Sequence, residues 1–128
     1  MESISSFRLW TGRVLSGVAI AFLFVDAVGK LMRLSPVVEG TVKLGYPESV
    51  VFTLGVLLIV GEALYAIPKT SLIGAIYLTA FLGGALATHL RVGSPLFTHV
   101  LFGVYVAVLV WAGLVLRTPR LLSLLMGQ

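Results

Sequence analysis

The sequence contains no cysteine among its 128 residues. A disulfide, a Cys-x-x-Cys dithiol, an iron–sulfur cluster and a thiolate zinc site all need that side chain, so each of them is excluded. Any redox chemistry must therefore belong to a bound cofactor or to a partner protein. A Gly-rich phosphate loop, a serine nucleophile motif and an HExxH helix are missing as well, so no motif assigns a catalytic reaction.

Charged residues are also scarce, at 11% against 59% hydrophobic residues. With a mean hydropathy of +1.09, the chain has too little polar surface to coat a water-soluble globule, so lipid must cover much of it. The formal net charge is +4, but the basic residues lie singly at the ends of apolar runs. This pattern is typical of membrane flanks and does not predict a nucleic-acid partner.

Four apolar runs predict one domain, residues 1–128, that is an all-α integral membrane bundle of four antiparallel helices. Breaks at Ser35-Pro36, Pro68 and Pro95 separate the runs, because proline disfavours a helical residue before it. The even number of crossings places both termini on one side of the membrane. We expect the spans at residues 11–34, 48–67, 72–90 and 98–116.

Basic residues flank the two sides almost equally. The side of the termini carries five and the other side four, so the positive-inside rule favours cytoplasmic termini by a single residue. The five are Arg8, Arg13, Lys69, Arg117 and Arg120, and the four are Lys30, Arg33, Lys43 and Arg91.

Small residues recur every four positions along the third span, in two rows that include Gly83, Gly84 and Ala87. Such rows let helix backbones approach closely in lipid, where no hydrophobic force draws helices together. We therefore expect this span to be the buried centre of the bundle, with these three residues at helix–helix contacts.

Ionisable residues within the spans are the main candidates for function, because their insertion into lipid is costly. Asp26 and Lys30 stand four positions apart on the first span, a spacing that pairs an acid with a base on one helix face. The pair could form the polar floor of a cavity that opens on the side opposite the termini. It could equally be a self-neutralised pair that only lowers the cost of insertion.

Glu62 lies within the second span and needs either a partner or a proton. Arg13 is the nearest cation by depth, so we expect an interhelical bridge between Arg13 and Glu62 that serves structure. The alternative is a carboxylic acid kept protonated by its apolar surroundings.

Polar residues converge where the third span ends and the fourth begins, with Thr88, His89 and Arg91 before the loop and His99 after it. Imidazole beside a carboxylate and an ammonium suits the head of a quinone or of another polar-headed lipidic molecule. We assign His89 to this site with Asp26, and leave His99 at the interface with headgroups and water. The two histidines have no recognised ligand spacing, so no metal site is predicted.

Several short motifs, in their order and spacing, resemble those of the DoxX-like family of small four-helix bacterial membrane proteins. The similarity spans nearly the whole chain. It rests on Phe24-Val25-Asp26-Ala27-Val28-Gly29-Lys30-Leu31, Leu44-Gly45-Tyr46-Pro47, Gly61-Glu62-Ala63-Leu64, Pro68, Gly74-Ala75, Gly84-Ala85 and Thr88-His89-Leu90-Arg91.

The resemblance implies a four-helix bundle in a bacterial cytoplasmic membrane, with Lys30, the Gly45-Tyr46-Pro47 turn and Glu62 as characteristic positions. The family is named after a subunit associated with quinone-linked thiosulfate oxidation, and distant animal relatives act as assembly chaperones. Our first hypothesis is a subunit with no cofactor of its own that binds a quinone or lipid near Asp26, Lys30 and His89. The alternative is a structural or assembly subunit. Both hypotheses place the chain among membrane lipid, as a homo-oligomer or within a larger membrane complex.

Overall fold

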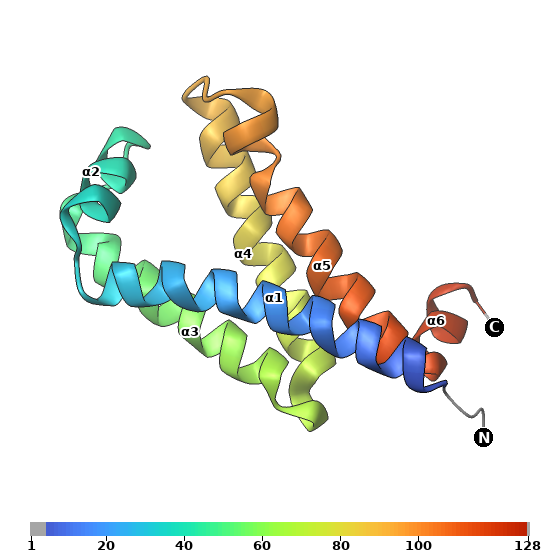
Figure 1. Ribbon diagram of the computed structural model, residues 1–128. Helices are drawn as coiled ribbons and strands as arrows, with labels where there is room; N and C mark the ends of the chain where they lie inside the picture. The colour runs from blue at the N-terminus through green and yellow to red at the C-terminus, as the bar shows by residue number, and fades with distance from the viewer. Residues whose placement is uncertain (1–4, 128) are drawn as a thin grey trace.

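The computed structural model describes residues 5–127, and within them every regular element is a helix. Four segments are long and apolar enough to cross a membrane, which confirms an all-α, multi-pass four-helix bundle (Figure 1). The segments are Ser6–Leu31, Glu48–Ala66, Pro68–Arg91 and Leu96–Arg117. Their α-helical parts are α1 (Ser6–Leu31), α3 (Val51–Ala66), α4 (Ser71–Arg91) and α5 (Phe102–Arg117).

Five short elements join or extend the spans. They are α2 (Ser35–Lys43), the 3₁₀ turns η1 (Glu48–Val50) and η2 (Pro68–Thr70), the π-helical turn η3 (Leu96–Val100), and α6 (Pro119–Leu125).

The first span differs at both ends from the range 11–34 expected from the sequence. It begins earlier because the Ser5 hydroxyl accepts a hydrogen bond from the Arg8 backbone N–H at 3.1 Å and caps the helix. It ends earlier, at Leu31. The residues Ser35 and Pro36, expected to end it, instead open α2, since proline is well tolerated in a first helical turn where its missing N–H is not needed.

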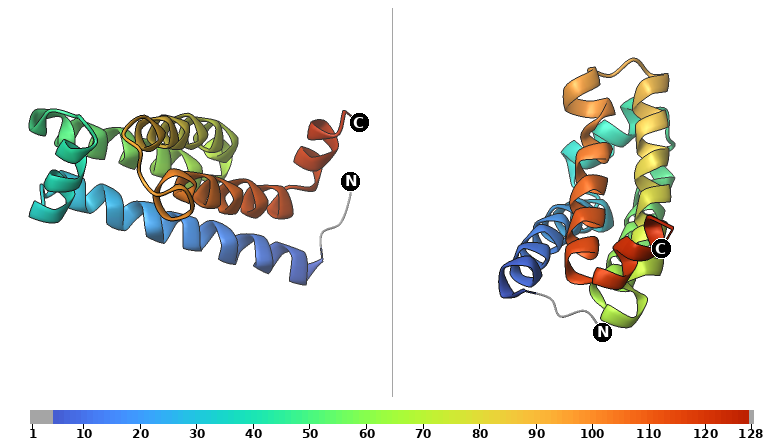
Figure 2. Two further views of the ribbon diagram at one scale, coloured as in Figure 1. Left: turned by 90° about the horizontal axis from the view of Figure 1, so that it is seen from above. Right: turned by 90° about the vertical axis from the view of Figure 1, so that its right-hand side faces the viewer.

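The spans form two pairs that meet at one end of the molecule and diverge toward the other. Helix α1 packs against α3 and α5, and α4 packs against α3 and α5. Figure 1 shows α1 and α3 running together toward α2, whereas α4 and α5 run together toward η3. We call α1, α2 and α3 the first arm, and α4, η3 and α5 the second arm. The N-terminal end of α1 and helix α6 both lie at the end where the arms meet, as the two views of Figure 2 also show.

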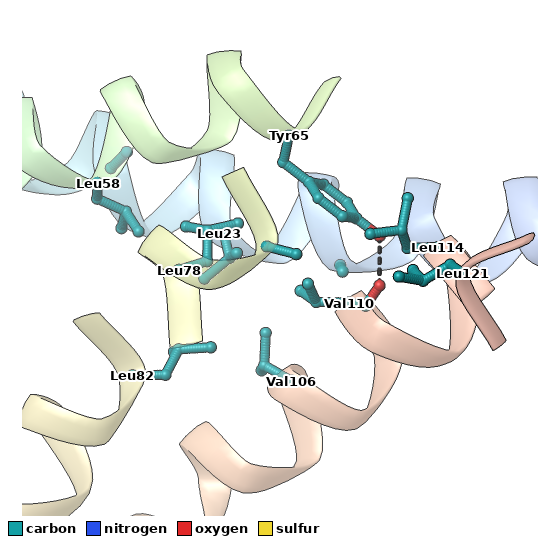
Figure 3. Packing of buried hydrophobic residues seen from close by; sticks show 12 residues of the cluster. Leu23, Leu58, Tyr65, Leu78, Leu82, Val106, Val110, Leu114 and Leu121 are labelled. Atoms are coloured by element: carbon teal, nitrogen blue, oxygen red, sulfur yellow. Dashed lines mark hydrogen bonds between the residues drawn. The ribbon is translucent and has the colours of Figure 1, made fainter. Parts of the chain in front are cut away.

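A hydrogen-bonded chain of side chains ties the arms together at their joined end. The buried Tyr65 hydroxyl on α3 donates to the Val110 carbonyl on α5 at 2.6 Å (Figure 3). Ser16 on α1 lies 2.7 Å from the same hydroxyl, and the Arg117 Nε–H donates to Ser16 at 3.2 Å. Three spans therefore share one polar network, surrounded by a core of Leu58, Leu78 and other buried apolar residues.

Glycine packs these helices closely, but at other positions than the sequence indicated. Gly83, Gly84 and Ala87 are exposed, and a Cβ added at either glycine would meet no atom within 4 Å. The expectation that they form helix–helix contacts, with α4 as the buried centre, is wrong. The close approaches are at Gly74, whose added Cβ would lie 2.5 Å from the Tyr65 Cα on α3, and at Gly113, whose added Cβ would lie 2.8 Å from the Ser16 backbone nitrogen on α1. The two arms diverge along the distal half of α4 (Figure 1), where Gly83, Gly84 and Ala87 are exposed.

Candidate functional site

A cavity of about 450 Å³ lies between the two arms, away from their joined end. Every long helix contributes to its walls, together with α2, the loop after it and η3. The apolar part of the lining comprises Leu23, Leu44, Leu54, Leu57, Ala80, Phe81, Leu82, Gly84, Ala85, Leu86, Phe102 and Gly103. The polar part comprises Asp26, Lys30, Thr41, Tyr46, Thr88, His89 and His99.

Asp26 and Lys30 form an ion pair on the cavity wall of α1, with the ammonium donating to the carboxylate. The Lys30 side chain is 15% exposed and the Asp26 side chain 44%, so the acid faces the open space more than the base does. Gly55 on α3 makes room for the lysine, because a Cβ at that position would lie 2.9 Å from the Lys30 Cβ. The pair is locally neutral, and Asp26 keeps acceptor sites free for a ligand.

His89 and His99 face one another across the turn between the last two spans. Their rings meet edge to face with centroids 5.7 Å apart. The Nδ1 atom of His89 bonds to the Ser94 hydroxyl at 3.0 Å, and that of His99 bonds to the Thr98 hydroxyl at 2.8 Å. Because Nδ1 is engaged in both rings, Nε2 is the atom that each offers to a ligand. His99, which the sequence left at the interface, lines the same cavity as His89.

The loop after α2 bridges the two arms at the mouth of the cavity. The Tyr46 and Thr88 hydroxyls lie 2.9 Å apart, and the Arg91 guanidinium donates to the Leu44 carbonyl at 2.9 Å. Gly45 permits this docking in two ways: its φ of +95° suits glycine, and an added Cβ would lie 2.8 Å from the Arg91 guanidinium. Two sequence motifs far apart in the chain therefore meet here.

Sequence reasoning did not place Tyr46 or Thr41 in the site. The available signal was the Gly45-Tyr46-Pro47 turn, which we interpreted only as turn chemistry and a family feature. Both hydroxyls reach the cavity because α2 folds back across the end of α1. The expected polar connection gave no indication of that helix.

The bridge expected between Arg13 and Glu62 does not form. Arg13 is exposed, and its guanidinium lies over the Trp10 ring, 4.9 Å from the ring centroid. Glu62 is only 4% exposed, and neither of its carboxylate oxygens has a hydrogen-bond partner among residues 5–127. The two residues lie on different helices, and their side chains point in different directions. The depth of a residue along its helix does not reveal the direction of its side chain.

The fold and cavity define a small multi-pass membrane protein with a polar-mouthed, apolar-walled pocket between splayed helix pairs. The chain matches the DoxX-like family over residues 14–113, and it belongs to that family. The matched range runs from early α1 to late α5 and so includes every cavity-lining residue. No curated protein and no solved structure matches the chain.

Proposed function

We propose that the protein binds an amphipathic small molecule, a quinone or a lipid, in the cavity between the two arms. The observation that carries the proposal is the division of the cavity lining into polar and apolar parts. Ionic and hydrogen-bonding groups from α1, the loop after α2, α4 and η3 line the same space as leucine and phenylalanine side chains. Such a lining suits a polar head attached to a hydrocarbon body.

The size and chemistry of the cavity agree with that ligand class. Its volume of about 450 Å³ falls in the usual range for small-molecule pockets. Lys30 can donate to a head-group carbonyl or phosphate, and Asp26 can accept from a hydroxyl. His89 and His99 can do either through Nε2, so the same site accommodates both the carbonyl and the hydroxyl form of a quinone head.

The proposed setting is the bacterial cytoplasmic membrane, with lipid around the spans and a second copy or a larger membrane complex as partner. A chain without cysteine offers no thiol for electron transfer, so in a redox system the electrons would pass between the bound quinone and that partner.

Titration of the protein in lipid nanodiscs with a short-tailed benzoquinone, read by native mass spectrometry, tests the proposal. Lys30→Ala removes a bond from a charged group, worth roughly 1.5–3 kcal/mol, and should weaken binding by about ten- to 150-fold. His89→Ala removes an imidazole bond, worth roughly 0.5–1.5 kcal/mol, and should weaken binding by about two- to tenfold. Arg120→Ala, at an exposed residue beyond the joined end, is the matched control and should bind normally.

Mass spectrometry of the gently purified protein would show whether a quinone or a lipid co-purifies. Unchanged affinity in both cavity variants would refute the proposed site. It would leave a structural or assembly subunit, with its polar residues as internal contacts, as the better account of the protein.

A further inference from the structure

Glu62 is a buried acid that the proposed ligand site does not use. It lies on α3 at 4% exposure, and both carboxylate oxygens lack a hydrogen-bond partner within the described residues 5–127. An ionised carboxylate without a partner is very costly in the interior of a membrane protein, whereas the neutral acid costs far less. The packing around Glu62 therefore suits the acid with its proton bound.

Two cations of the bundle, one on α1 and one on α5, are committed to other groups. Lys30 on α1 pairs with Asp26. Arg117 on α5 donates to Ser16 and lies over the Tyr65 ring, 5.8 Å from its centroid. Neither cation is therefore free to form an ion pair with Glu62.

The titratable phenols on the neighbouring elements are engaged as well. The Tyr65 hydroxyl, one turn along α3, donates to Val110. The Tyr77 hydroxyl on α4 donates to the Leu57 carbonyl at 2.5 Å. Asp26 on α1 remains as a carboxylate able to take up a proton.

Asp26 stands at nearly the same depth as Glu62 on the facing helix. Lys30 and Gly55 are in contact where α1 and α3 cross, and the two helices run in opposite directions. From this crossing toward the joined end, Asp26 is four residues away along α1 and Glu62 is seven residues away along α3. At a rise of 1.5 Å per residue, the depths of the two side chains therefore differ by about 4.5 Å. Asp26 also lines the cavity.

We propose that Glu62 is a proton-binding site in the membrane interior, and that it exchanges its proton with the cavity through Asp26. On release, the Glu62 hydroxyl gives its proton to a water molecule that enters between the two side chains, and that water gives a proton to the Asp26 carboxylate, from which it passes to water or to a ligand in the cavity. Uptake follows the reverse order. The net charge is unchanged by the transfer, because Glu62 becomes a carboxylate as Asp26 becomes a neutral acid. The Lys30 ammonium keeps its charge throughout. The inference does not depend on the identity of any ligand.

Labelling with dicyclohexylcarbodiimide, an apolar reagent that reacts with protonated carboxyl groups in membranes, tests the proton on Glu62. In wild-type protein in liposomes at neutral pH, peptide mass spectrometry should find the adduct on Glu62, and Glu62→Gln should lose it. A water-soluble carbodiimide should instead modify the exposed Glu39 and Glu48. If Glu62 stays unlabelled in the folded protein while it reacts after denaturation, the acid is ionised or inaccessible and the proposal fails.

Infrared spectroscopy tests the route. The carbonyl stretch of a protonated Glu62 should be present in wild type and lost in Glu62→Gln, and transfer into D₂O should shift it as deuterium replaces the proton. Asp26→Asn keeps the size of the side chain but cannot accept the proton, and should slow this exchange at least tenfold. Exchange at the wild-type rate in a folded Asp26→Asn variant would overturn the role of Asp26. A protonated Glu62 with a purely structural role would give the same band, but its exchange rate would not change in Asp26→Asn.

Discussion

Gly74→Ala should destabilise the protein through a single backbone contact. Gly74 on α4 faces Tyr65 on α3, and an added methyl group would lie 2.5 Å from the Tyr65 Cα and 2.7 Å from the Leu64 carbonyl carbon. Ordinary contacts begin near 3.4 Å, so the two helices would have to separate by about 1 Å. Backbone atoms cannot rotate away as a side chain would, and overpacking of this kind costs about 1–3 kcal/mol.

Gly83→Ala is the matched control, since the same substitution in the same helix meets no atom within 4 Å. Alanine favours a helix over glycine by up to ~1 kcal/mol, and because both variants gain this term, their difference isolates the packing cost. Unfolding in a series of mixed micelles with rising dodecyl sulfate, followed by circular dichroism, measures the free energy of unfolding. We expect Gly74→Ala to be less stable than Gly83→Ala by about 1–3 kcal/mol. Equal stabilities would refute the packing shown at the α3–α4 contact.

Two further substitutions test the polar links between the arms. Tyr65→Phe removes a buried hydroxyl that bonds to two other helices, and should cost about 0.6–1.7 kcal/mol for each bond lost. Tyr105→Phe also loses one bond, to the Phe97 carbonyl, but at an exposed position within the second arm, so it should cost less than Tyr65→Phe in the same assay. Gly45→Ala should free the loop at the cavity mouth, because it strains a positive φ and displaces the bound guanidinium. Trypsin should then cleave after the exposed Lys43 several times faster than in wild type, whereas Gly40→Ala, with no atom within 4 Å, should leave the rate unchanged.

The four spans could be predicted because their signal is local. Runs of about 20 apolar residues are long enough to cross the bilayer whatever else the chain does. The pairing of Asp26 with Lys30 is local too, since it depends only on a four-residue spacing within one helix. The small helix α2 was missed because its residues have no long apolar run, and a turn followed by proline is equally consistent with a loop.

Contacts between spans could not be predicted in the same way, because the depth of a residue does not fix the direction of its side chain. Arg13 and Glu62 were matched by depth alone, yet Arg13 lies on Trp10 and faces outward. Gly83 illustrates the same point on α4. The four-residue spacing shows that one face of this helix carries small residues, but only the three-dimensional arrangement shows whether another helix covers that face. His99 reaches the cavity through the turn that brings it against His89.

The pairing of α1 with α5 has a consequence for the order in which the protein is assembled. The first span to leave the ribosome can pair with α3 early, but it meets its second partner, α5, only after the fourth span has been synthesised, because Gly12 packs against Gly113 and Ser16 bonds to Arg117. Until then the nascent chain can form the α1–α3 and α3–α4 pairs, but the polar face of α1 near Ser16 remains open to lipid or to an insertion factor. A chain that stops before α5 keeps the bond between Ser16 and Tyr65 but lacks the Arg117 donor and the Val110 acceptor of the same network. It therefore exposes an incomplete polar cluster within the membrane, a feature by which quality control could recognise it.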